Sequence, residues 1–217
     1  MPSITLSLSR SRTARSITCS EATQDRDRGA EAARFRAAPP RRTIGGVGER
    51  FTVRAAVPAD LEAVAAICAH YVTTTVTTFE EVPPTVADWR QRLDDLAGRN
   101  LPFLVAEQDG AVCGYAYASP WRPKPAYQYT VEDTVYLSPA HTGRGLGRAL
   151  LGALLTGCEQ AGVRQVVAVI ADTDSDASVA LHRRLGFDAA GRLCRVGRKH
   201  GRWIDTVLMQ RELGRDR

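Results

Sequence analysis

The sequence predicts a mixed α/β domain, with one mixed β-sheet of about six to seven strands and helices on both of its faces. Three observations predict it. Segments with strand-like alternation take turns with segments of helical periodicity along residues 51–217. Asp109-Gly110 marks a tight antiparallel hairpin. Residues 166–171 are a continuous apolar run, which is typical of a strand buried on both faces.

The domain begins with one strand and two helices. Residues 51–55 alternate between apolar and polar side chains, as in a half-buried strand. Pro58 begins a helix in which apolar residues from Leu61 to Tyr71 recur at helical spacing, and Thr85 is a suitable cap for a second helix. Two helices therefore separate the first strand from the rest of the sheet.

The remaining strands follow in the second part of the domain. Strands over 103–107 and 112–117 flank the hairpin turn, and residues 130–137 form a strand that runs into a glycine-rich turn and a helix ending near Gln160. The last expected elements are the strand over 166–171, a short helix over 178–185 that ends at Gly186, and a closing hairpin over 189–194 and 203–211.

Residues 1–50 differ in composition from this domain. They are rich in Ser, Arg, Ala and Thr and poor in large apolar side chains, so we expect a disordered N-terminal extension. Its first residues superficially resemble a transit peptide, but we expect a dispensable tail or a start codon set too far upstream. Its ten arginines and five acids account for the net charge of +5, because the 19 bases and 19 acids of residues 51–217 balance. This balance argues against a nucleic-acid partner.

The cysteines and the hydropathy exclude other classes of protein. The five cysteines are odd in number and widely spaced, without a CxxC pair, so we expect neither a disulfide framework nor a metal site. No apolar run approaches the roughly 20 residues that span a bilayer, so we expect no membrane contact. The sequence therefore predicts a soluble, cytoplasmic protein whose cysteines are small buried residues.

A glycine-rich turn is the first motif that points to chemistry. Gly143, Gly145 and Gly147 alternate between a strand and a helix, where glycine lets backbone N–H groups approach a ligand and the helix start favours negative charge. Arg144 and Arg148 add cations, so the turn is suited to hold a pyrophosphate. Taken alone, it also fits a plain strand-to-helix turn or a dinucleotide site, although its spacing is GxGxG rather than GxGxxG and it lacks the Lys-Ser/Thr of a P-loop.

The residues around this turn extend the motif. Residues 131–150 resemble the core motif of the GNAT N-acetyltransferase superfamily, with Thr142 where the superfamily usually has Gln or Arg. Residues 178–187, a short helix ending in Gly-Phe, resemble the next motif of the superfamily. Four segments more narrowly resemble the phosphinothricin / methionine sulfoximine N-acetyltransferase branch. They are YAYASPWR at 115–122, YTVE at 129–132, VAVI at 167–170 and KHGRWID at 199–205.

The resemblance spans about residues 51–213 and implies the GNAT fold, in which central strands splay to admit the pantetheine arm of acetyl-CoA. It implies that Glu132 is the general base and that His182, where many members have Tyr, protonates the leaving thiolate. Asp133 is expected to point to the opposite face of its strand, so it is not a candidate base. The alternatives are a solvated carboxylate for Glu132 and a packed helix histidine for His182.

The resemblance also implies binding residues. Acetyl-CoA as co-substrate is expected to contact Val135, Tyr136, Leu137, Gly143, Arg144, Gly145, Leu146, Gly147, Arg148 and Ser175. For the acceptor, Arg122 is the candidate cation for a carboxylate, Tyr127 and Tyr129 are candidate pocket walls, and Thr78-Phe79 matches an acceptor-region segment of the branch.

These residues predict an acetyl-CoA-dependent N-acetyltransferase that acts on the amine of a small amino-acid-like substrate by direct attack, without a covalent enzyme intermediate. Two alternatives stay open. The acceptor can be another amine, such as a polyamine, an antibiotic or a protein N-terminus, or the protein can be a non-catalytic acyl-CoA-binding module. Because relatives commonly dimerise, the resemblance also implies a homodimer.

Overall fold

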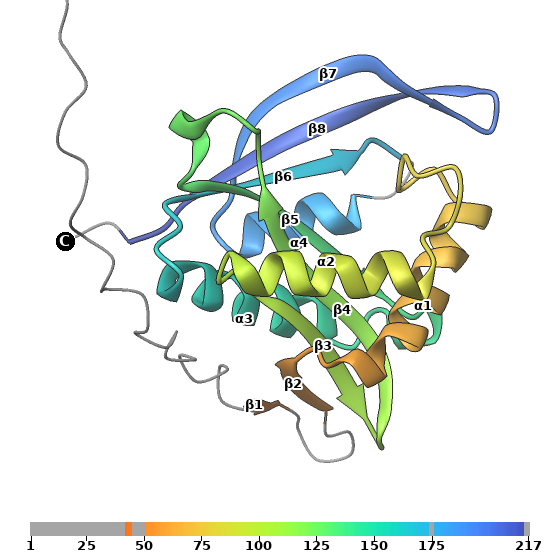
Figure 1. Ribbon diagram of the computed structural model, residues 1–217. Helices are drawn as coiled ribbons and strands as arrows, with labels where there is room; N and C mark the ends of the chain where they lie inside the picture. Colours follow the sequence, from red (N-terminus) through yellow and green to blue (C-terminus); the bar gives the residue numbers. More distant parts are fainter. Residues whose placement is uncertain (1–41, 45–50, 174–175, 215–217) are drawn as a thin grey trace, which may run out of the picture. The chain divides into compact units, whose positions relative to one another are not determined.

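The computed structural model describes residues 42–44, 51–173 and 176–214 (Figure 1). Its strands are β1 Arg42–Ile44, β2 Phe51–Ala55, β3 Phe103–Gln108, β4 Ala111–Pro120, β5 Thr130–Leu137, β6 Gln165–Ala171, β7 Asp188–Lys199 and β8 Arg202–Glu212. Its α-helices are α1 Leu61–Thr74, α2 Val86–Gly98, α3 Leu146–Gln160 and α4 Ala177–Arg184, and its short 3-10 helices are η1 Pro58–Asp60, η2 Pro125–Tyr127 and η3 Pro139–His141. The mixed α/β prediction is confirmed.

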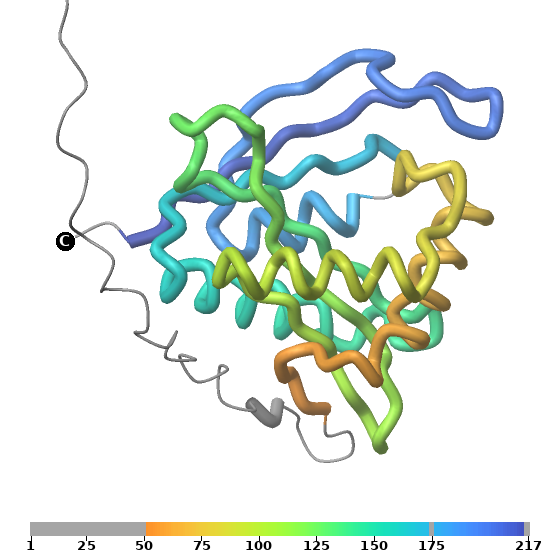
Figure 2. Tube along the Cα trace, viewed as in Figure 1, coloured from red at the N-terminus to blue at the C-terminus, as the bar shows by residue number. Residues whose placement is uncertain are grey.

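The strands form one mixed sheet in the order β1-β2-β3-β4-β5-β6-β8-β7. Within the described ranges, β5 and β6 are the parallel pair, and the other neighbours pair antiparallel. Helices α1 and α2 cover one face, and α3 and α4 cover the other (Figures 1 and 2). Each face has its own apolar cluster: Trp89 and Tyr115 belong to the first, and Leu150 and Phe187 belong to the second.

The centre of the sheet is splayed. Strands β5 and β6 pair only through Thr130, Val131 and Glu132, which lie opposite Gln165 to Val167. Beyond Glu132, β5 stays paired with β4, and β6 stays paired with β8. The facing edges of the two strands are therefore unpaired beyond Glu132, so their N–H and C=O groups are left for a ligand that enters between them. The expected splay is confirmed.

Strands β1 and β7 depart from the sequence-based expectation. Strand β1 is an eighth strand inside the segment for which disorder is expected, and it pairs antiparallel with β2. Residues 1–41 and 45–50 lie outside the described part of the chain, so the expected disorder there stays a prediction. Strand β7 is longer than the expected range 189–194. Register shifts interrupt its pairing with β8, and one of them lies between Leu193 and Gly197. Bulges and exposure of most of β7 remove the alternation by which a strand is recognised.

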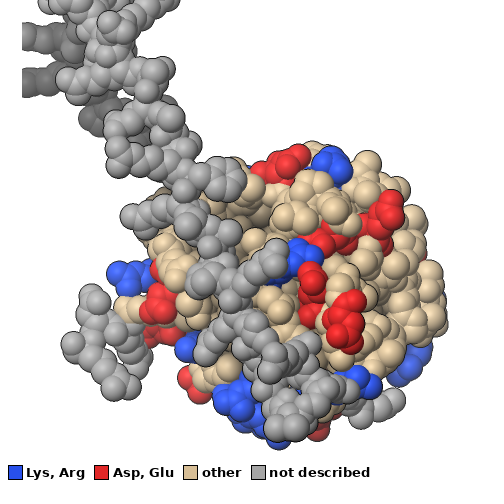
Figure 3. All heavy atoms as spheres, turned by 90° about the horizontal axis from the view of Figure 1, so that it is seen from below, with Lys and Arg blue, Asp and Glu red and all other residues tan. Residues whose placement is uncertain are grey.

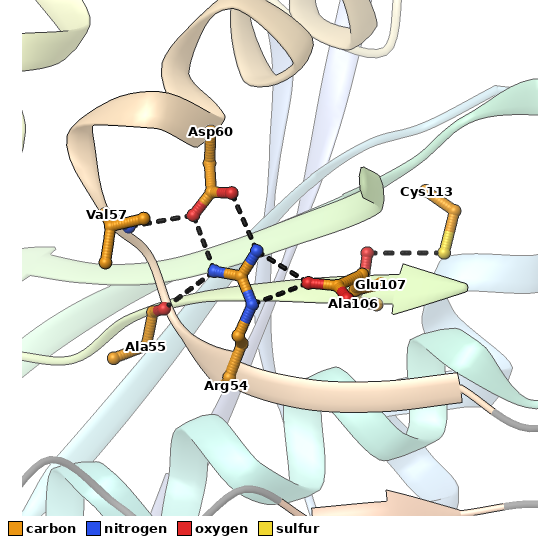
Figure 4. Close-up of polar contacts among 7 residues, drawn as sticks. All are labelled: Arg54, Ala55, Val57, Asp60, Ala106, Glu107 and Cys113. Carbon is orange, nitrogen blue, oxygen red and sulfur yellow. Dashed lines mark hydrogen bonds and ion pairs between the residues drawn. The ribbon is translucent and has the colours of Figure 1, made fainter. Parts of the chain in front are cut away.

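A partly buried charge cluster fixes the start of α1 to the sheet (Figure 4). Arg54 of β2 donates two hydrogen bonds to Asp60 of η1, at 2.7 and 2.8 Å, and one of 2.7 Å to Glu107 of β3. Burial by itself raises the pKa of Asp60, but the hydrogen bonds from Arg54 and from the Val57 amide outweigh it, so this pKa lies below its ordinary value. A paired guanidinium and carboxylate can be buried here, where an unpaired charge could not.

The charged side chains and the apolar character of the helices are relevant to binding of polyanions and of membranes. Both acidic and basic side chains are visible on the face drawn in Figure 3. In the described ranges, no helix has the length and the apolar character needed to cross a membrane.

Candidate active site

The glycine turn joins β5 to α3 at the open end of the splay. Gly143 and Gly145 have φ angles of +77° and +83°, in the left-handed region that glycine adopts without strain. Gly145 is the N-cap of α3 and supplies no side-chain hydrogen bond. The first N–H groups of α3 therefore lack intrahelical acceptors and can bind an anion.

Gly147 serves a different purpose from the other two glycines. A Cβ at Gly147 would lie 3.3 Å from Cδ2 of Leu181, whereas a Cβ at Gly143 or Gly145 would meet nothing within 4 Å. Gly147 thus lets α3 pack closely against α4, and Gly143 and Gly145 shape the turn through their φ angles. Leu146 is fully buried in the core, so only its backbone is available to a ligand.

On β5, the side chains of the predicted cofactor residues make contacts within the protein, so we expect acetyl-CoA to meet their backbone groups. The side chains of Val135 and Leu137 pack against the core on the α3 side. The hydroxyl of Tyr71 donates to the carbonyl oxygen of Leu137 at 2.7 Å, which fixes the end of the strand. Tyr136 points to the other face, where its hydroxyl donates to the carbonyl oxygen of Thr77 at 3.3 Å. The tyrosine therefore contacts the loop between α1 and α2.

The remaining predicted cofactor residues are Arg144, Arg148 and Ser175. Arg144 and Arg148 are exposed, on the turn and in the first turn of α3. Ser175 lies outside the described residues, so its contact with acetyl-CoA stays a prediction.

Glu132 lies at the apex of the splay. It is the last β5 residue that pairs with β6, and its side chain is half-buried. Burial raises the pKa of Glu132, the charge of Asp133 raises it further, and the charge of Arg122 opposes both. A carboxylate whose pKa is closer to neutrality accepts a proton more readily, which suits a general base.

His182 lies on the opposite face of β5, in a buried ion pair with Asp133. Its Nε2 is 3.0 Å from Oδ2 of Asp133, and its Nδ1 is 2.7 Å from the carbonyl oxygen of Ser178. His182 and Asp133 are 4% and 8% exposed. Both ring nitrogens lie within hydrogen-bond distance of oxygen acceptors, an arrangement that favours the doubly protonated imidazolium. Burial lowers the pKa of His182, but the hydrogen bond and charge of Asp133 and the Ser178 carbonyl outweigh it, so the pKa is raised.

Asp133 is the residue that sequence reasoning missed. It points away from the Glu132 face, as the strand alternation predicts, and on the other face it meets His182. Its second oxygen, Oδ1, is buried and has no hydrogen-bond partner among the described residues. The available signal was an acid on an otherwise apolar strand face between Val131 and Val135, because a buried carboxylate needs a partner.

The predicted acceptor residues lie in two loops. The β4–β5 loop holds Arg122, whose guanidinium stacks 4.8 Å from the ring of Trp121, and the exposed side chains of Tyr127 and Tyr129. The α1–α2 loop holds the partly exposed Thr78 and the exposed Phe79. A cavity of about 490 Å³ next to this second loop is lined by Thr73, Thr74, Thr75, Val76, Thr77, Thr173, His200 and Arg202.

Comparison with known proteins agrees with this geometry. The model of the Acetyltransferase (GNAT) family matches residues 65–187, more than half of the chain. The chain belongs to the GNAT acetyltransferase family. This GNAT acetyltransferase is an acetyl-CoA-dependent N-acetyltransferase, and acetyl-CoA is its co-substrate. The described residues contain no group of three or more His, Cys, Asp or Glu that could hold a metal ion.

The named relatives indicate which members of the family this chain is similar to. Phosphinothricin N-acetyltransferase of Alcaligenes faecalis is 49% identical over 162 residues, which cover 75% of this chain and 82% of the relative. L-methionine sulfoximine/L-methionine sulfone acetyltransferase of Salmonella typhimurium is 39% identical over 165 residues, which cover 75% and 94%. A GNAT superfamily phosphinothricin acetyltransferase from Sinorhizobium meliloti, solved in complex with AcCoA, has a TM-score of 0.72 and 46% identity, covering 76% of this acetyltransferase and 89% of that chain.

The φ angle of Gly145 allows the predicted pyrophosphate-binding role of the glycine turn to be tested. A β-branched residue at this angle costs of order 1–3 kcal/mol, so Gly145→Val should raise the KM for acetyl-CoA about tenfold in steady-state assays. Gly152→Ala is the control, because Gly152 lies within α3 and has open space for a methyl group. It should leave this KM unchanged and stabilise the fold by about 0.5–1 kcal/mol. A wild-type KM for acetyl-CoA in Gly145→Val would contradict the role of the turn.

Proposed function

We propose that this acetyltransferase acts on the α-amine of a small amino-acid-like substrate of the phosphinothricin or methionine sulfoximine/sulfone type. The observation that carries the proposal is the position of Glu132, half-buried at the apex of the splay and within electrostatic reach of the Arg122 cation. A carboxylate that takes a proton from an amine, next to a cation that binds a carboxylate, suits an α-amino acid. The names of the relatives point to the same substrate class.

The proposed reaction is a direct transfer. Glu132 takes a proton from the acceptor ammonium, directly or through a water molecule, so that the amine is neutral when it attacks. The nitrogen lone pair forms a bond to the thioester carbonyl carbon, and the carbon–sulfur bond then breaks. The nitrogen, positively charged after the attack, loses its second proton to solvent water, so the products are a neutral N-acetyl amine and a CoA thiolate, which takes up one proton.

His182 is the proposed donor of that last proton. Asp133 raises the pKa of His182 and so keeps the imidazole protonated until the thiolate forms. The carbonyl oxygen of Ser178 accepts a hydrogen bond from Nδ1–H. The proton to be transferred is therefore the one on Nε2, which donates to Asp133 before the thiolate forms. Asp133 therefore acts as a positioning residue in this scheme.

A panel of acceptors tests the substrate class. Thiol release from acetyl-CoA should be fast with phosphinothricin, methionine sulfoximine and methionine sulfone, and slow with spermidine and with a peptide N-terminus. The cavity next to the α1–α2 loop supports this order, because its lining includes the cation Arg202 and, among the described residues, no Asp or Glu. A higher kcat/KM for spermidine than for the amino acids would overturn the proposal.

Arg122 is the proposed ligand of the acceptor carboxylate. Arg122→Gln should raise the KM for amino-acid acceptors about tenfold, since a hydrogen bond to a charged group is lost. Because the charge of Arg122 lowers the pKa of Glu132, its removal should also shift the acidic limb of the kcat/KM profile to higher pH. Lys124→Gln, an exposed cation of the same loop, is the control and should change neither quantity. An unchanged KM in Arg122→Gln would assign the carboxylate to another group.

We also propose a homodimer, on the basis of the β7–β8 hairpin. The apolar side chains of Leu193, Val196 and Trp203 are 44%, 50% and 55% exposed on it. Exposed apolar groups gathered on one hairpin are typical of a protein–protein contact. Light scattering after gel filtration should give twice the chain mass, and a monomer at micromolar concentration would contradict the proposal.

A further inference from the structure

The loop between α1 and α2 is held from two strands of the sheet. The hydroxyl of Tyr136 on β5 donates to the carbonyl oxygen of Thr77. Lys199, the last residue of β7, donates from Nζ to the carbonyl oxygen of Thr78 at 2.8 Å. The next residue, Phe79, lies against Gly197 of β7. Residues 77–79, which include the predicted acceptor residues Thr78 and Phe79, therefore depend on β7, although β7 follows them by more than a hundred residues.

Lys199 is unusual among the residues of β7. The strand is exposed along most of its length, yet Lys199 is 3% exposed. The bond to Thr78 is the one hydrogen bond that its side chain makes within the described residues, and no ion pair there includes it. Burial lowers the pKa of Lys199, and the charges of the nearby Glu80 and Glu81 oppose this. A buried ammonium without a partner is costly in free energy, so the hydrogen bond from Lys199 to the carbonyl oxygen of Thr78 is a strong one. We call this hydrogen bond the tie between β7 and the α1–α2 loop.

Gly197 makes room for the ring of Phe79. A Cβ at Gly197 would lie 2.4 Å from Cε2 and 2.5 Å from Cζ of that ring, closer than carbon atoms approach without displacement. The register shift between Leu193 and Gly197 sets the pairing of this part of β7, in which Gly197 lies opposite Ile204 and Lys199 opposite Arg202. The bulge thus determines which residues of β7 face the loop.

We propose that Gly197 and Lys199 are positioning residues for the acceptor: they hold residues 77–79 in place and so set which acceptors bind. The inference rests on the proposed function, because it takes this loop as part of the acceptor site. Neither residue is needed for acetyl transfer itself. The loop position governs acceptor binding, whereas Glu132 and the glycine turn govern proton transfer and cofactor binding.

Lys199→Met tests the tie, because it keeps the apolar stem and removes the donor. The KM for the acceptor should rise at least about tenfold, and kcat at saturating acceptor and the KM for acetyl-CoA should stay within about twofold. Arg198→Met is the matched control: it removes an exposed cation from the neighbouring position of β7 and should change none of these constants. An unchanged acceptor KM in Lys199→Met would overturn the inference.

Gly197→Ala is a second and independent variant, because it leaves every charge in place. The added methyl group displaces the ring of Phe79, so the acceptor KM should again rise. In a Phe79→Ala background, the same change should add nothing, since the ring it displaces is gone. Equal effects of Gly197→Ala in both backgrounds would show that the ring contact does not position the loop. This variant also decides the matter if Lys199→Met fails to fold.

Hydrogen–deuterium exchange separates this inference from the proposed function. Without any acceptor, amides 75–82 should exchange faster in Lys199→Met than in the wild type, while those of α3 stay unchanged. If the wild-type enzyme acetylates no amino acid but the loop exchange still rises, the proposed function fails and the tie stands. If amino acids are acetylated and both the exchange and the acceptor KM match the wild type, the inference fails alone.

Discussion

Glu132→Gln is expected to lower kcat/KM for the acceptor by about 10²- to 10⁴-fold, the usual contribution of a general base. The amide keeps the shape of the side chain but cannot take a proton from the acceptor. Because the glycine turn and the edges of the splay are untouched, the Kd for acetyl-CoA, measured by calorimetry, should stay at the wild-type value. Loss of the chemical step without loss of cofactor binding is the signature of a base.

The pH profile adds a second readout for Glu132. The pKa of Glu132 is raised, so the wild-type kcat/KM should fall as the pH drops through a value above the ordinary glutamate range. The variant should lack this acidic limb. Glu62→Gln removes an exposed carboxylate of α1 and is the control, with wild-type rates expected. Wild-type turnover in Glu132→Gln would remove Glu132 as the base.

His182→Leu is expected to destabilise the protein by about 3–5 kcal/mol in urea unfolding, because it leaves the buried carboxylate of Asp133 without its partner. The pKa of His182 is raised in the folded state. Its contribution to stability is therefore fully present below the unfolded pKa of about 6.5 and is lost as the pH rises through the folded pKa. The difference in unfolding free energy between wild type and variant should therefore shrink as the pH rises.

A double variant separates pairing from packing at this site. His182→Leu combined with Asp133→Leu removes both charges, and replacing a buried ion pair by apolar residues is often close to neutral for stability. We therefore expect the double variant to be more stable than His182→Leu alone. The opposite order would show that the ion pair is not what the single variant disrupts. For catalysis, an unchanged rate and pH profile in His182→Phe would assign His182 to packing.

Much of the fold could be predicted from local patterns. Alternation, the Asp109-Gly110 turn and the apolar run of β6 identify strands because burial leaves a periodic trace in the sequence. Strand β7 leaves little trace, because it is exposed along most of its length and interrupted by bulges, so only part of it was expected. Strand β1 has three residues, too few for any period to be visible.

The site could be predicted only where chemistry is local in the sequence. The positive φ angles of Gly143 and Gly145 follow from their residue type, and Glu132 is found by its place in a motif. The contact of Asp133 with His182 joins residues 49 positions apart, on a strand and a helix whose packing no local pattern specifies. The sequence could place Asp133 on the far face, but not say what it meets there. The tie between β7 and the acceptor loop was hidden for the same reason.

One matched pair of substrates tests whether the enzyme recognises an α-amino acid as its acceptor. Methionine sulfone and its decarboxylated counterpart, 3-(methylsulfonyl)propylamine, differ only in the α-carboxylate. Their kcat/KM values should be measured by thiol release at saturating acetyl-CoA. We expect methionine sulfone to be preferred by at least about tenfold, the effect of one lost contact with a charged group. Equal values, or a preference for the decarboxylated amine, would contradict it.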